Sequence, residues 1–156
     1  MNEEQEMNEE QETCADVSNA GTRPVEFTSH APADDKLHHR KLSFDIVGCA
    51  QRVHRALGPG FPETVYQKAL CYELMAAGIP FETEKPVEVL YLGKPCGQFR
   101  MDLLVDEKVI VELKALENLT DDHMAQSLTY LKATDLRLAL LMNFGNKSLK
   151  VQRVVL

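Results

Sequence analysis

Two alternating segments, residues 98–105 and 109–116, constrain the fold more than any other part of the chain. They are joined by the polar residues 106–108. If a three-residue turn pairs Val105 with Val109, opposed residue numbers sum to 214. One face of the hairpin is then wholly apolar, with Met101, Leu103, Val105, Val109, Val111 and Leu113. A shift of one residue would scatter charges over both faces, so the pattern predicts this antiparallel register.

The opposite face of the predicted hairpin carries Asp102, Glu112 and Lys114, with Asp102 directly across from Glu112. Opposed carboxylates repel, but they become favourable when a divalent cation such as Mg²⁺ lies between them. Lys114 shares their face because strand side chains alternate, and there it suits holding a water or stabilising a phosphate. Together these groups predict a phosphodiester-hydrolysing site. The alternative is a solvated charged face, since such short patterns recur by chance.

The remaining patterns predict a mixed α/β domain with the element order ααβββαββ. Apolar residues at helical spacing indicate a helix over 42–57, and a second helix lies between Pro62 and Gly78. Alternation at 87–91 gives the first strand, ahead of the hairpin, and Thr120 caps a third helix. Strands over 136–144 and 149–155 complete the order, the first of them apolar enough to be buried on both faces.

Charge divides the chain of 156 residues into two parts. Residues 1–40 hold ten acidic and three basic residues, which accounts for the whole net charge of −7 and leaves 41–156 neutral. The tandem repeat MNEEQE and few large apolar residues predict a disordered acidic tail over 1–40, and a folded domain over 41–156. A neutral domain argues neither for nor against a nucleic-acid groove.

Other compositional signals narrow the class of protein. No stretch approaches the roughly 20 apolar residues of a membrane helix, and no secretory signal is visible, so no membrane partner is expected. The four cysteines lack a CxxC pair or a nearby histidine, which suggests neither a zinc site nor a disulfide framework. A reducing cytoplasm is the expected compartment.

Residues 60–66, GFPETVY, match the signature of the bacterial GxxExxY protein family. Asp102, the segment 111–115 (VELKA), His123, Gln126, the segment 130–132 (YLK) and the segment 143–145 (NFG) follow in that family's order. The resemblance covers about 41–156. This family resembles a compact branch of the PD-(D/E)XK nuclease superfamily, whose restriction-endonuclease-like αβββαβ core fits the predicted order with one extra N-terminal helix. Met101 stands where the superfamily's name has proline, a loosely kept position.

The resemblance implies catalytic roles for Asp102, Glu112 and Lys114. It implies Mg²⁺ or Mn²⁺ bound by Asp102, Glu112, the carbonyl of Leu113 and Glu63. Glu63 is alternatively an acid that stabilises a helix N-terminus, following Pro62. The remaining candidates are Tyr66, His123, Gln126 and Tyr130. The resemblance implies that they orient the site or contact the substrate. The alternative is that they are ordinary core and helix-edge residues.

These observations favour a metal-dependent nuclease acting on nucleic acid, with DNA the expected substrate. A second hypothesis is a catalytically silent nucleic-acid- or protein-binding module that keeps the fold. A third is a hydrolase of another phosphate ester. The intact set of Asp102, Glu112 and Lys114 favours the first hypothesis over the second.

Overall fold

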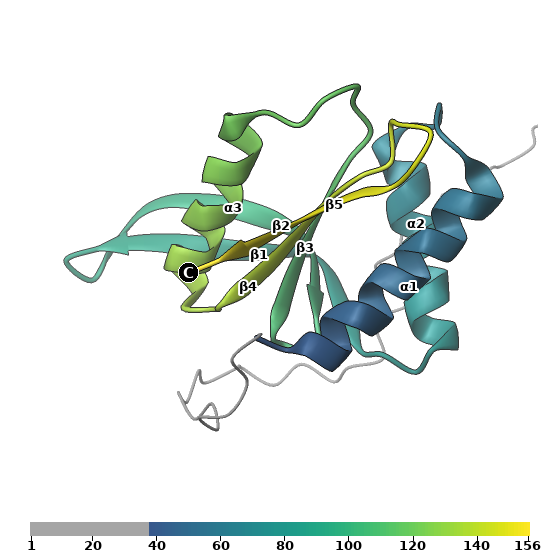
Figure 1. Cartoon of the computed structure of the whole chain (residues 1–156). Helices are drawn as coiled ribbons and strands as arrows, with labels where there is room; N and C mark the ends of the chain where they lie inside the picture. The colour runs from purple at the N-terminus through teal and green to yellow at the C-terminus, as the bar shows by residue number, and fades with distance from the viewer. Residues whose placement is uncertain (1–37) are drawn as a thin grey trace, which may run out of the picture.

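The computed structural model describes residues 38–156, so the predicted tail lies outside the described residues except at its last three positions. The elements follow the predicted order ααβββαββ (Figure 1). The first helix begins two residues before the predicted start. The elements are α1 (Arg40–Leu57), α2 (Glu63–Ala76), β1 (Phe81–Tyr91), β2 (Lys94–Val105), β3 (Val109–Lys114), α3 (Asp121–Thr134), β4 (Leu138–Asn143) and β5 (Lys150–Val155).

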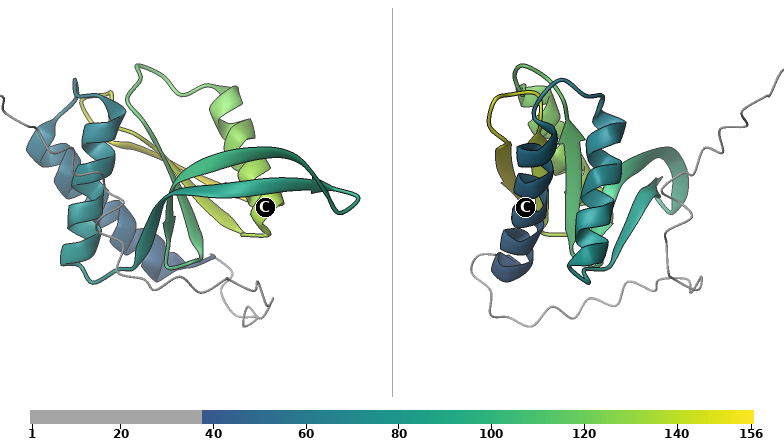
Figure 2. Two further views of the ribbon diagram at one scale, coloured as in Figure 1. Left: turned by 180° about the vertical axis from the view of Figure 1, so that it is seen from behind. Right: turned by 90° about the vertical axis from the view of Figure 1, so that its right-hand side faces the viewer.

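The strands form one five-stranded sheet in the order β1-β2-β3-β4-β5. Only β3 and β4 pair in parallel, because α3 carries the chain between them, and the other neighbours are antiparallel. Helices α1 and α2 cover one face of the sheet and α3 lies on the other, while the β1–β2 hairpin extends beyond the helices (Figure 2). The mixed α/β class is therefore confirmed.

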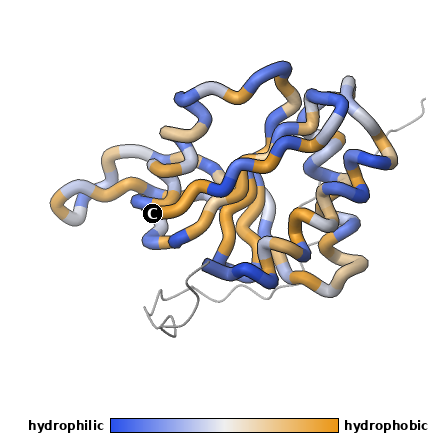
Figure 3. Tube along the Cα trace, in the orientation of Figure 1, coloured by the Kyte–Doolittle hydropathy of each residue, from blue (hydrophilic) through white to orange (hydrophobic). Residues whose placement is uncertain are grey.

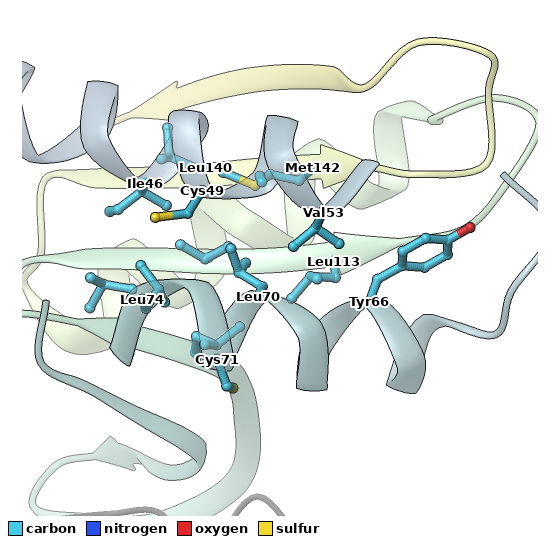
Figure 4. Packing of buried hydrophobic residues seen from close by; sticks show 14 of the residues in the cluster. Ile46, Cys49, Val53, Tyr66, Leu70, Cys71, Leu74, Leu113, Leu140 and Met142 are labelled. Carbon is cyan, nitrogen blue, oxygen red and sulfur yellow. The ribbon is translucent and has the colours of Figure 1, made fainter. Parts of the chain in front are cut away.

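The predicted register of the central hairpin is confirmed where β2 and β3 pair. Val105 lies opposite Val109, and Leu103 lies opposite Val111. Their side chains enter a core under α1 and α2 that also contains Leu70 and Leu113 (Figure 4). The apolar face thus directs the hairpin against the two N-terminal helices, as burial of apolar surface requires.

A second, smaller core lies between the sheet and α3, and it corrects one prediction. The alternation predicts that Met101 shares a face with Leu103, but Met101 packs in the α3 core with Leu104 and Tyr130. The β2–β3 ladder stops at Leu103, so the regular pleat is not imposed beyond that residue. This break in the ladder lies at Asp102.

The central strands consist largely of hydrophobic residues, as Figure 3 shows along the tube. Every residue of β4 is buried, which confirms the prediction of a strand covered on both faces. No helix within residues 38–156 combines the length and apolar character needed to cross a membrane.

Candidate active site

The candidate site lies where the β2–β3 ladder ends. Beyond the Leu103–Val111 pair, side-chain carboxylates replace backbone carbonyls as hydrogen-bond acceptors. The Leu113 N–H donates to Asp102 Oδ2 over 2.8 Å, and the Asp102 N–H donates to Glu112 Oε1 over 3.4 Å. Asp102 and Glu112 are therefore cross-strand neighbours, as the register predicts. Each carboxylate accepts one backbone N–H, which leaves a second oxygen as a potential ligand for a cation.

Both carboxylates resist ionisation. Burial, followed by the charge of Asp102, raises the pKa of Glu112 to about 8. Burial also raises the pKa of Asp102, against the lowering effects of the Leu113 N–H and of Lys114. The pair therefore carries less than two full negative charges at neutral pH, and a bound cation would favour the ionised forms.

Lys114 and Glu63 complete the charged group from two different elements. Lys114, at the end of β3, is half-buried and its charge lowers the pKa values of Asp102, Glu112 and Glu63. Glu63 is the first residue of α2, and burial raises its pKa, with Asp102 a further cause. The structure thus brings Glu63 close enough to the hairpin for electrostatic coupling with Asp102 and Lys114.

Glu84 and Gln67 belong to the same region, although sequence analysis did not identify them. Glu84 has a positive φ of 51°, and its pairing with Asp102 is skipped in the β1–β2 ladder. Its carboxylate raises the pKa values of Asp102 and Glu63. The side chain of Gln67 reaches from α2 to both Glu84 and the Asp102 carbonyl. The predicted first strand, 87–91, does not reach Glu84, and the residue type of a single glutamate does not indicate a left-handed backbone within β1.

Tyr130 and Gln126 approach the site from α3. The Gln126 side-chain amide donates to Tyr130 Oη over 2.7 Å, as their spacing of four on one helix allows. The Tyr130 ring stacks on Phe99 with centroids 4.1 Å apart. Burial raises the Tyr130 pKa, and the charge of Glu112 adds to this. The phenol is therefore a neutral hydrogen-bonding group beside the carboxylates.

Tyr66 and His123 have structural contacts that account for them. Tyr66 is fully buried, stacks on Phe144, and donates its hydroxyl to the Gly58 carbonyl, which orders the loop before α2 (Figure 4). His123 accepts the Thr120 N–H and forms a capping box at the start of α3. Tyr66 thus positions Glu63 indirectly, by fixing where α2 begins.

The donor set fits a hard divalent cation bound mainly by water. Within residues 38–156, no three His, Cys, Asp or Glu side chains are gathered closely enough to bind a metal ion together. Asp102 and Glu112 provide two carboxylates, and Mg²⁺ in proteins uses one or two carboxylates and keeps several waters. The chemistry of this pair therefore suits Mg²⁺, and Glu63 lies close enough to raise the pKa of Glu112.

Comparison with known proteins supports one family. The model of the PD-(D/E)XK nuclease superfamily matches residues 40–154, which include every candidate residue. This match does not distinguish the GxxExxY branch from others. No curated protein and no solved structure matches the chain significantly.

Proposed function

Because this chain belongs to the PD-(D/E)XK nuclease superfamily, we propose that it is a metal-dependent nuclease that hydrolyses phosphodiester bonds, with DNA as the expected substrate. The observation that carries this proposal is the pair of half-buried Asp102 and buried Glu112 at the end of the β2–β3 ladder, with Lys114 beside it. Two neighbouring acids, one buried and one half-buried, are costly in a purely structural role. A cation-binding role explains why both acids lie there.

Asp102 and Glu112 would hold Mg²⁺ or Mn²⁺ through carboxylate oxygens, with the Leu113 carbonyl as a further ligand. Glu63 is not gathered closely enough with this pair to bind the same ion directly, so it would contact the waters that the ion keeps. The bound metal would supply Lewis-acid stabilisation of the phosphate and a more acidic water. The hydrogen bond from the Leu113 N–H fixes the orientation of the Asp102 carboxylate before any ligand arrives.

Lys114 carries the positive charge that the chemistry needs outside the metal. Its ammonium cannot bind a cation, so we assign it to the attacking water or to the charge that develops on the phosphate. Tyr130, held by Gln126 and stacked on Phe99, is assigned to the substrate backbone as a neutral hydrogen-bond donor. The His123 side chain accepts the Thr120 N–H in the capping box of α3, so we assign it no chemical step.

The test is a cleavage assay on supercoiled plasmid, linear duplex and single-stranded DNA, each with Mg²⁺, Mn²⁺ or EDTA. We expect metal-dependent cleavage that is abolished in Asp102→Asn. Asp135→Asn is the matched control, because Asp135 is exposed at the end of α3 and Asn tolerates its left-handed backbone. This control should cleave at the rate of the unmodified chain.

Two results would contradict the proposal. One is the absence of cleavage of any DNA or RNA substrate by a protein that is folded and binds the metal. Such a result would favour the silent binding module. The other is full cleavage by Asp102→Asn, which would place the active site elsewhere. Cleavage of RNA alone would change the substrate class and keep the reaction type.

A further inference from the structure

The side-chain amide of Gln67 joins α2 to both strands of the β1–β2 hairpin. Its Nε2 lies 2.9 Å from Glu84 Oε1 and 3.2 Å from the Asp102 carbonyl oxygen. Gln67 follows Glu63 by four residues on α2, so the two side chains lie on the same face of that helix. One amide therefore contacts the backbone of Asp102, a proposed metal ligand, and lies one helical turn from Glu63.

The hairpin is distorted where Gln67 contacts it. Glu84 has a left-handed backbone that non-glycine residues rarely adopt, and the Glu84–Asp102 pair is missing between two regular pairs of the β1–β2 ladder. At the same residue, Asp102, the ladder to β3 also stops. Strand β2 thus lacks regular backbone pairing on both sides of Asp102. Hydrogen bonds that involve side chains hold its conformation there, from β3 at the Asp102 N–H and carboxylate and from Gln67 at the Asp102 carbonyl.

A glutamine amide suits these two acceptors in particular. Its nitrogen carries two N–H groups, one for the Glu84 carboxylate and one for the Asp102 carbonyl. A glutamate would offer acceptors only, and a methionine of similar length would offer neither bond. Donation to Glu84 also lessens the repulsion between the Glu84 and Asp102 carboxylates on neighbouring strands.

We propose that Gln67 is a positioning residue of the metal site, which holds Asp102 through its main-chain carbonyl and so sets the direction of the Asp102 carboxylate. This inference rests on the proposed function for the identity of the site. Gln67 touches neither the cation nor the substrate. Its loss should leave the fold intact and weaken metal binding, because partners that orient metal ligands govern affinity.

The experiment measures Mn²⁺ binding to the full chain by electron paramagnetic resonance, beside thermal unfolding in EDTA. The variants are Gln67→Met, which removes both hydrogen bonds at similar length, and Gln67→Asn, which keeps the amide but shortens its reach. Gln51→Met, on the exposed side of α1, is the matched control. We expect both Gln67 variants to bind Mn²⁺ about 10- to 100-fold more weakly, with the control within about twofold.

A Mg²⁺ titration of cleavage separates positioning from a general loss of structure. We expect the half-saturating Mg²⁺ concentration to rise in Gln67→Met while the rate at saturating Mg²⁺ recovers to within a few-fold. Unchanged Mn²⁺ affinity in both Gln67 variants would overturn the inference. So would a loss of affinity that only follows the fraction of unfolded protein.

The two proposals fail in different ways. An unmodified chain that binds Mn²⁺ but cleaves nothing contradicts the nuclease assignment, while the Mn²⁺ comparison still decides the role of Gln67. Equal binding by the unmodified chain and Gln67→Met contradicts only the positioning role. An unmodified chain that binds no Mn²⁺ overturns both.

Discussion

The strongest stability prediction concerns Glu112, whose side chain is almost fully buried. Its pKa of about 8 lies well above the ordinary value of 4.5, because burial and then Asp102 disfavour the charged form. A carboxyl with a raised folded-state pKa contributes stability that is fully present below its unfolded pKa. That stability is lost as the pH rises through the folded pKa. The relevant window is therefore about pH 4.5 to 8.

The size of this effect follows from the shift. At about 1.36 kcal/mol for each pH unit, keeping Glu112 buried costs about 3 kcal/mol at pH 7 relative to pH 4.5. That is a large part of the roughly 5–15 kcal/mol by which typical domains are stable. Glutamine has nearly the same shape and does not ionise. Without metal, the stability of Glu112→Gln relative to the unmodified chain should therefore rise by about 3 kcal/mol as the pH goes from 4.5 to 7.

Urea unfolding in EDTA, repeated from about pH 4 to 8, measures this difference directly. Glu117→Gln is the matched control, because it makes the same substitution at an exposed position. Saturating Mg²⁺ should reverse the order of stability, since the unmodified chain gains binding energy and the Glu112→Gln variant lacks a ligand charge. A stability difference that stays flat, or that shrinks as the pH rises, would refute the electrostatic reasoning.

Three other variants test separate parts of the structure. Lys114→Ala should keep its Mn²⁺ affinity but lose about a hundredfold or more in single-turnover cleavage, with poor rescue by Lys114→Arg; unchanged cleavage would remove Lys114 from the mechanism. Gly145→Ala should destabilise the fold by about 1–3 kcal/mol in urea unfolding, because a Cβ at this position would overlap the main chain of Leu116. Tyr66→Phe should cost about 1–2 kcal/mol by the same measurement, since the hydroxyl donates to the Gly58 carbonyl; an unchanged midpoint would show that this bond adds nothing.

The central hairpin was predictable because its apolar alternation is compatible with one register. Only a three-residue turn, which pairs Val105 with Val109, makes one face of the predicted hairpin wholly apolar. The same alternation failed at Met101, which faces α3. Side chains alternate between the two faces only while the strand keeps its regular backbone hydrogen bonds to its neighbour. No sequence pattern marks the residue at which side-chain carboxylates replace backbone carbonyls as the acceptors.

The parts of the site that sequence analysis missed depend on contacts between distant segments. Gln67 and Glu84 are 17 residues apart and belong to different elements. Neither lies in a pattern of its own, and a left-handed Glu84 is not expected from its residue type. Tyr66 is a residue that sequence analysis did identify but could not place. Its spacing after Glu63 allowed a role at the site or in the core, and its stacking on Phe144 shows that it packs in the core.

The two carboxylates at the ladder break are not equivalent, and their hydrogen bonds explain why. Asp102 accepts a short bond of 2.8 Å from the Leu113 N–H, whereas Glu112 accepts a longer one of 3.4 Å. Hydrogen bonds to charged groups contribute about 1.5–3 kcal/mol, and they weaken as they lengthen, so Asp102 is the better stabilised anion. When the pair holds a single proton, that proton therefore belongs on Glu112. Binding of a divalent cation near neutral pH must then displace this proton, because a cation and a proton compete for the same carboxylate.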